Sequence, residues 1–152
     1  MTIEQRIADL GLTLPSPPLP VANYVPRKLV GSFLYLSGMI PVRSGEPFRR
    51  GKLGGSVSVE DGIECARICT LNALGWARQA LGDLDRIHEV VRVRGFVACT
   101  PEFTDHPRVL NGCSDLLVDL LGDAGRHVRS AVGCPSLPLD VPVEIDFVFT
   151  TR

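Results

Sequence analysis

The stretch VEIDFVF at residues 143–149 indicates the fold most directly. Its apolar residues recur at every second position, which is typical of a strand that turns one face to a hydrophobic core. Glu144 lies between two of them and so points to the opposite face. A second apolar stretch that contains Arg129 precedes it, and we expect the two to be neighbouring strands with Arg129 beside Glu144. The predicted core face consists of Val143, Ile145, Phe147 and Phe149.

Arg129 and Glu144 together suit the binding and conversion of a small carboxylate. The planar guanidinium of an arginine donates two parallel hydrogen bonds to a carboxylate ligand, and a nearby glutamate can move a proton or position a water molecule. His127 precedes Arg129 by two positions and shares its face of the strand. The alternative interpretation is a structural ion pair or a solvated face of the sheet.

Two long helices are predicted upstream of these strands. The first spans 58–82, because it opens with the Ser-x-x-Asp pattern of a capped helix start and closes at a glycine. The second spans 107–122, with a proline in its first turn and a glycine at its end. Strands are predicted at 33–37 and 86–99, and a loop or loosely paired hairpin at 42–55. The order β, β, α, β, α, β, β predicts an α+β domain, a mixed β-sheet with two long helices packed on one face.

Residues 1–20 are predicted to form an N-terminal helix and a proline-rich extension, ahead of a single domain at 21–152. Thr2 and Gln5 match a capping box. An extended connector follows the helix, because proline fixes φ and cannot continue a helix. The shared apolar face of the helix is Ile3, Ile7 and Leu10, and the prolines of the connector are Pro15, Pro17, Pro18 and Pro20.

Two further apolar side chains suggest contacts between copies of the chain. Ile68 and Leu71 fall on the otherwise polar back face of the helix at 58–82. In a monomer that face would be exposed to water, so these residues hint at an oligomer.

The composition excludes several classes of protein. The chain has 152 residues and a formal net charge of −1, without the basic patch that a nucleic-acid-binding protein needs. It has no apolar run long enough to cross a membrane and no secretory leader pattern. The five cysteines are an odd number and form no CxxC pair, so they read as packing thiols in a reducing cytoplasm. No metal or nucleotide cofactor motif is present.

Several short motifs in one order resemble a known family. The sequence is similar to the RidA/YjgF proteins, the reactive intermediate deaminases that are often labelled L-PSP endoribonucleases. The similarity covers roughly residues 20–152. Within its last part, the separations between the arginine, the Leu-Pro pair and the glutamate match those of the family. The motifs are Asn23-Tyr24-Val25, Ser37-Gly38-Met39-Ile40-Pro41, Asn111, Arg129-Ser130, Leu137-Pro138 and Glu144-Ile145.

The resemblance implies a role for each matching residue. Arg129 would bind the substrate carboxylate with two hydrogen bonds, and Glu144 would position or activate the water. Tyr24 would lie at the mouth of the site and Asn111 would support it. Ser37–Gly38 would complete the substrate-binding residues.

The resemblance also implies a fold and an activity. The fold would be that of chorismate mutase of the trimeric type, a homotrimer with its active sites in clefts between subunits. The activity would be hydrolysis of enamine or imine intermediates, such as 2-aminoacrylate, to a 2-keto acid and ammonia without a cofactor. An imine is already electrophilic, so holding it by its carboxylate beside an ordered water supplies most of the positioning that the reaction needs.

Departures from the family pattern indicate a divergent branch. Ala131 stands where the family often has a cysteine, and the nearest thiol is Cys134. One more residue than usual separates Asn111 from Arg129. Two other functions remain open: a non-catalytic module that binds a small carboxylate through Arg129, and an endoribonuclease, which the near-neutral charge disfavours.

Overall fold

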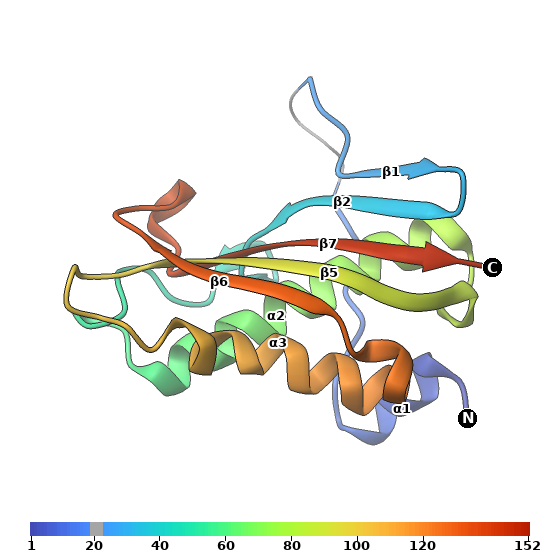
Figure 1. Ribbon diagram of the computed structural model, residues 1–152, viewed down its shortest axis with the longest axis horizontal. Helices are drawn as coiled ribbons and strands as arrows, with labels where there is room; N and C mark the ends of the chain where they lie inside the picture. The colour runs from blue at the N-terminus through green and yellow to red at the C-terminus, as the bar shows by residue number, and fades with distance from the viewer. Residues whose placement is uncertain (19–22) are drawn as a thin grey trace.

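Five strands form one mixed sheet, which confirms the predicted α+β class (Figure 1). The computed structural model describes residues 1–18 and 23–152. In spatial order the strands are β1 (Arg27–Val30), β2 (Phe33–Met39), β7 (Val143–Thr151), β5 (Ile87–Ala98) and β6 (Val128–Cys134). All neighbouring pairs are antiparallel except β5 and β6, which are parallel.

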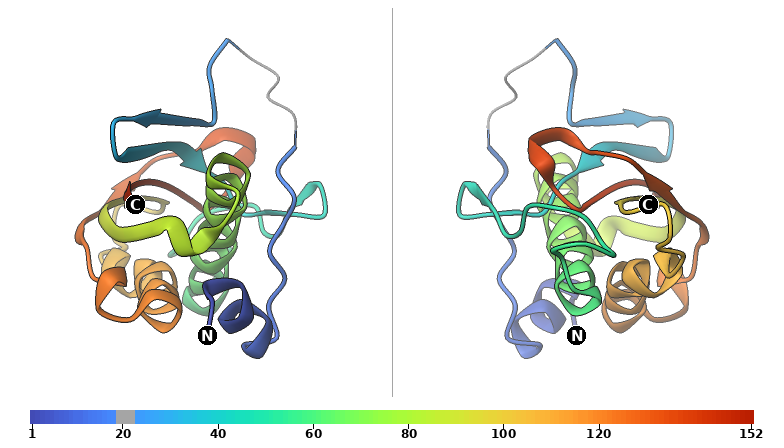
Figure 2. Two further views of the ribbon diagram at one scale, coloured as in Figure 1. Left: turned by 90° about the vertical axis from the view of Figure 1, so that its right-hand side faces the viewer. Right: turned by 90° about the vertical axis from the view of Figure 1, so that its left-hand side faces the viewer.

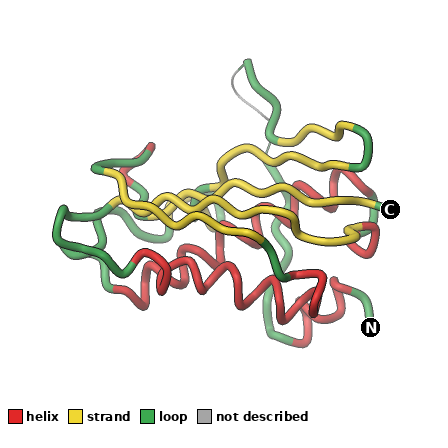
Figure 3. Tube along the Cα trace, viewed as in Figure 1, coloured by secondary structure: helices red, strands yellow, loops and turns green. Residues whose placement is uncertain are grey.

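Both long helices cover one face of this sheet, as predicted (Figures 1 and 3). Helix α2 (Val59–Leu81) begins after Ser58, whose side chain caps it, and ends at Gly82 with φ of 79°. Helix α3 (His106–Leu121) connects the parallel strands β5 and β6, because such a pair needs a crossover connection.

The core lies between the sheet and these helices. The predicted inward face of β7 is wholly buried, so the alternation in the sequence identified it correctly. The neighbouring strand β5 contributes further apolar side chains to the same layer. The residues of β7 in question are Val143, Ile145, Phe147 and Phe149.

The short helix α1 (Ile3–Asp9) packs against α3 and has the predicted capping box. Ile3 and Ile7 are buried in the core, whereas Leu10 is 47% exposed, so its predicted place on the apolar face is wrong. Leu10 is the C-terminal cap of the helix and no longer follows helical geometry, which turns its side chain to solvent.

The prediction that the back face of α2 is exposed is also wrong. Ile68 is 3% and Leu71 is 9% exposed within a single chain. The segment after α1 runs along this side of α2, and the Pro15 carbonyl leaves no room for a Cβ at Gly75 (Figure 2). The extended connector therefore covers the face that appeared free in the sequence. Pro20 and the predicted boundary between residues 20 and 21 lie outside the described residues.

The remaining elements are short. Strand β1 was not predicted, because it is a mostly exposed edge strand whose four residues show no alternation. Strands β3 (Val42–Arg43) and β4 (Glu46–Pro47) form a short hairpin within 42–55, where a loop or loosely paired hairpin is predicted. The 3-10 turns are η1 (Leu84–Arg86), η2 (Gly122–Gly125) and η3 (Pro138–Asp140).

Candidate functional site

Arg129 lies on strand β6, at the edge of the sheet, and its side chain reaches toward α3. Its Nη1 donates to Oδ1 of Asn111 at 2.9 Å and to Oγ of Ser114 at 3.1 Å. The structure thus brings together Arg129 and Asn111, two of the residues predicted for the site. Both remain exposed to solvent, so a small ligand can reach the guanidinium.

His127 joins this group through Ser114. Its Nε2 lies 2.9 Å from the Ser114 hydroxyl, and its Nδ1 lies 2.6 Å from the Gly125 carbonyl. Burial lowers the pKa of His127, and the nearby Arg129 charge lowers it further, against the Gly125 hydrogen bond that raises it. The imidazole is therefore neutral at pH 7. The expected proximity of His127 to Arg129 is confirmed, whereas Ser114 was missed, although its place three positions after Asn111 on a helix was a usable signal.

Glu144 belongs to a second group, on the face of the sheet away from the helices. A Cβ at Gly38 would overlap the Glu144 carboxylate, so the glycine allows this close approach. Next to Gly38, the Ser37 hydroxyl donates to the Val25 carbonyl at 2.8 Å. Tyr24, which precedes Val25, is 59% exposed. The second group therefore consists of Glu144, Gly38 and Ser37, and Tyr24 is linked to it only through its chain neighbour Val25.

Two features of its surroundings raise the pKa of the Glu144 carboxyl group. Burial raises the pKa of its carboxyl group above the usual 4.5, and the charge of Asp146 raises it further. Asp146 itself is held by Arg94, with Nη2 of the arginine 3.0 Å from Oδ2. A carboxyl group with a raised pKa is better matched to proton transfer near neutral pH than an ordinary glutamate.

The two groups lie on opposite faces of the sheet, which corrects the expectation that Arg129 lies beside Glu144 in one chain. Arg129 is in register with Val93, which pairs with Phe147, and Phe147 points into the core. Glu144 lies three positions from Phe147, so it points to the other face. The expectation that these two strands are neighbours is also wrong, because β5 lies between β6 and β7 and sets their register.

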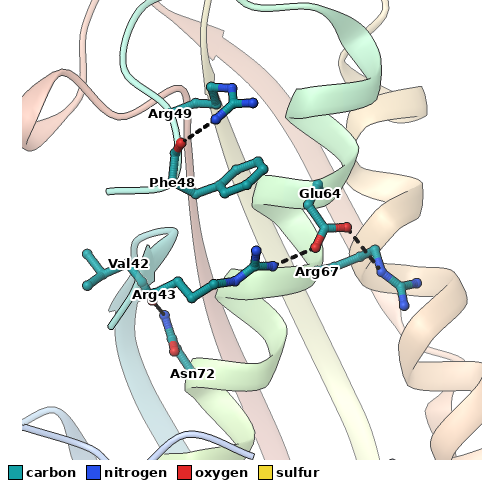
Figure 4. A network of polar contacts seen from close by, with 7 residues as sticks. All are labelled: Val42, Arg43, Phe48, Arg49, Glu64, Arg67 and Asn72. Carbon is teal, nitrogen blue, oxygen red and sulfur yellow. Dashed lines mark hydrogen bonds and ion pairs between the residues drawn. The ribbon is translucent and has the colours of Figure 1, made fainter. Parts of the chain in front are cut away.

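Contacts of the loop after β2 hold the second group, which includes Gly38 and Glu144, in place. The Asn72 side chain of α2 donates to the carbonyl of Ile40 at 3.0 Å, directly after β2. It also donates to the carbonyl of Val42 at 3.0 Å (Figure 4). In the same region the guanidinium of Arg43 is 2.7 Å from Glu64 and stacks over the ring of Phe48. These contacts attach the β3–β4 hairpin to α2 and so fix the end of β2 that carries Gly38.

A strained turn precedes β7. Leu139 and Asp140 have φ values of 57° and 59°, a region that residues other than glycine rarely adopt. The Gly51 amide donates to the Asp140 carbonyl at 2.8 Å, and Arg50 donates to the Leu139 carbonyl at 2.9 Å. The loop at 50–51 thereby holds the turn that leads into the strand of Glu144.

The cysteines are mostly packing residues, as predicted. Cys65, Cys69 and Cys113 are wholly buried, and burial raises the pKa of the Cys65 and Cys113 thiols to about 12. Cys134 is partly buried at the end of β6, with a raised pKa that is due first to burial. Within residues 1–18 and 23–152, no three His, Cys, Asp or Glu side chains are grouped closely enough to hold a metal ion.

None of the helices in the described part of the chain combines the length and the hydropathy that a membrane span requires.

The mixed sheet with two helices on one face is the arrangement of the chorismate mutase-like fold. Residues 4–150 match the family model described as "YjgF/chorismate mutase-like, putative endoribonuclease", and the chain belongs to this family. It is 41% identical over 145 residues to Protein TCP17 of Trypanosoma cruzi, covering 95% of this chain and 91% of that protein.

Solved structures agree with this assignment. The chain is similar to Atu1372 of Agrobacterium tumefaciens, a protein of unknown function, with 42% identity, a TM-score of 0.94, and coverage of 99% and 92% of the two chains. It is also similar to a "putative endoribonuclease" of Shewanella oneidensis MR-1, with 35% identity, a TM-score of 0.95 and 99% of each chain covered.

Proposed function

We propose that the chain hydrolyses small reactive enamine or imine acids of the 2-aminoacrylate type to 2-keto acids and ammonia. The observation that carries this proposal is that two polar side chains, Arg129 and Glu144, are each held in place by neighbouring residues. One is an exposed guanidinium held by Asn111 and Ser114, and the other is a half-buried carboxyl group with a raised pKa beside Gly38. The first suits a substrate carboxylate, and the second suits a water molecule.

Because Arg129 and Glu144 lie on opposite faces of the sheet, a site that uses both residues needs a second copy of the chain. We propose a homotrimer with Arg129 of one copy facing Glu144 of the next. Apolar side chains on the sheet face away from the helices support this arrangement, since a neighbour would cover them. Tyr35 is 45%, Val132 is 46% and Val128 is 66% exposed.

The reaction would need no cofactor. Two hydrogen bonds from Arg129 to the carboxylate place the electrophilic imine carbon in a fixed position. Glu144 takes a proton from the attacking water and can return it to the departing amine. The five free cysteines fit a reducing compartment, so we propose a cytoplasmic location.

The experiment is a stopped assay of 2-keto acid release from 2-aminoacrylate generated in the same tube. Wild type should accelerate release, and Arg129→Ala should not. Arg126→Ala is the matched control, because Arg126 is an exposed arginine three positions away whose side chain contacts Asp123. Equal release with and without wild-type protein would contradict the proposal.

A non-catalytic module that binds a small carboxylate is the second candidate. The exposed, hydrogen-bonded guanidinium of Arg129 favours it, because this group could hold a ligand without any role for Glu144. Such a module would bind 2-ketobutyrate in calorimetry but release no 2-keto acid from an imine, and Glu144→Gln would change neither result.

An endoribonuclease is the third candidate, and it rests on the description of the family and the name of the Shewanella relative. The formal net charge of −1 gives it no physical support. Cleavage of single-stranded RNA that is lost in Arg129→Ala, without imine hydrolysis, would favour it.

A further inference from the structure

The hydrogen bonds from Arg129 through Ser114 and His127 all run in one direction, from donor to acceptor, and end at the Gly125 carbonyl. A carbonyl only accepts, so the 2.6 Å contact with Gly125 requires a hydrogen on Nδ1 of His127. The neutral imidazole then has a lone pair on Nε2. The Ser114 hydroxyl, 2.9 Å away, must donate its hydrogen to that lone pair.

This direction determines what Ser114 offers to Arg129. With its hydrogen committed to His127, the Ser114 oxygen presents only lone pairs, and it accepts from Nη1 of Arg129 at 3.1 Å. Asn111 Oδ1 accepts from the same nitrogen at 2.9 Å. Both hydrogens of Nη1 are therefore used within the protein.

The opposite edge of the guanidinium is left for a ligand. In the described part of the chain, neither Nε nor Nη2 of Arg129 has a hydrogen-bond partner. These two nitrogens form one flat edge that can donate two parallel hydrogen bonds to a carboxylate.

We propose that Ser114 and His127 are positioning residues that turn the Nε–Nη2 edge of Arg129 toward the substrate carboxylate. The inference rests on the proposed function, because it assumes that Arg129 binds the substrate. Without the His127 acceptor, the Ser114 hydrogen is free to point at the guanidinium, and the guanidinium loses one of its two supports.

A merely structural role would have different consequences. If the contacts only attached β6 to α3, their loss would lower stability and change kcat and KM in no particular pattern. A positioning role changes the affinity for the carboxylate and leaves the chemical step alone. The two roles are therefore separated by KM against kcat and by which substitution restores function.

Replacing His127 with asparagine or with glutamine separates its two hydrogen bonds, the one to Gly125 and the one to Ser114. His127→Asn places an amide where Nδ1 is and keeps the Gly125 contact, but it cannot reach Ser114. His127→Gln places an amide oxygen where Nε2 is and can still accept from Ser114. His88→Asn is the control, since His88 is an exposed histidine on β5.

The experiment measures three quantities on wild type and these variants: the Kd for 2-ketobutyrate by calorimetry, the kcat and KM for imine hydrolysis, and the thermal unfolding midpoint. We expect His127→Asn and Ser114→Ala to raise Kd and KM about tenfold with little change in kcat, as for the loss of one hydrogen bond to a charged group. His127→Gln and His88→Asn should stay within about twofold of wild type.

Two results would overturn the inference. In one, His127→Asn and His127→Gln are equally impaired, which would show that acceptance from Ser114 is not the function of His127. In the other, Ser114→Ala lowers kcat with an unchanged KM, which would assign Ser114 a chemical role. A wild-type protein that neither binds 2-ketobutyrate nor hydrolyses imines would instead reject the proposed function, and the inference with it.

Discussion

Replacing Arg129 with lysine tests the clamp with the smallest change in charge. The arginine uses Nη1 for Asn111 and Ser114 and has the Nε–Nη2 edge left for a carboxylate. A lysine ammonium is a single point charge, so it cannot serve the two protein acceptors and form a planar pair of bonds to the ligand together. The lost transition-state binding is about 2–4 kcal/mol, or roughly thirty- to a thousand-fold in kcat/KM.

The assay is imine hydrolysis beside calorimetric binding of 2-ketobutyrate. Stability should change by less than about 1 kcal/mol, because Arg129 is exposed at a sheet edge. Arg126→Lys is the matched control and should behave as wild type, since the Arg126 side chain is 72% exposed. Wild-type kinetics in Arg129→Lys would show that the guanidinium fork is not used.

Four further outcomes are expected. Gly38→Ala should push the Glu144 carboxylate away and lower kcat/KM at least about tenfold, and Gly38→Ser should lower it as well. An active Gly38→Ala enzyme would show that this contact is dispensable. Glu144→Gln should lower kcat but leave 2-ketobutyrate binding unchanged, and it should raise the unfolding midpoint at pH 7. The reason is the raised pKa of Glu144. The protonated carboxyl group contributes to the stability of the folded state, and this contribution is lost as the pH rises through that pKa. A neutral amide does not ionise and so avoids the loss. Alkylation of thiols in the folded protein should leave activity intact, because Cys65, Cys69 and Cys113 are buried; inactivation without unfolding, seen by circular dichroism, would argue otherwise. Light scattering should give the mass of three chains of 16.5 kDa, and a single-chain mass at micromolar concentration would exclude the shared site.

Local patterns in the sequence were enough for the main elements of the fold. The alternation in β7, the Ser58 cap and Gly82 each act within a few residues, and each was predicted correctly. The exposure of Ile68 and Leu71 was predicted wrongly because it depends on the N-terminal connector, which is distant in sequence.

The candidate site shows the same division between local and distant contacts. The grouping of His127 with Arg129 follows from strand periodicity, and Ser114 could have been added from its helical spacing to Asn111. The separation of Arg129 from Glu144 could not be predicted, because it depends on how two strands are each paired with β5.

Complementation between two inactive variants tests the shared site most directly. Arg129→Ala and Glu144→Gln chains with different affinity tags are co-expressed, and mixed oligomers are purified through both tags. In every mixed trimer, one of the three interfaces joins an intact Arg129 to an intact Glu144 of the neighbouring chain. The account predicts recovery of about one third of the wild-type rate of imine hydrolysis. Mixed trimers as inactive as either parent variant would contradict it.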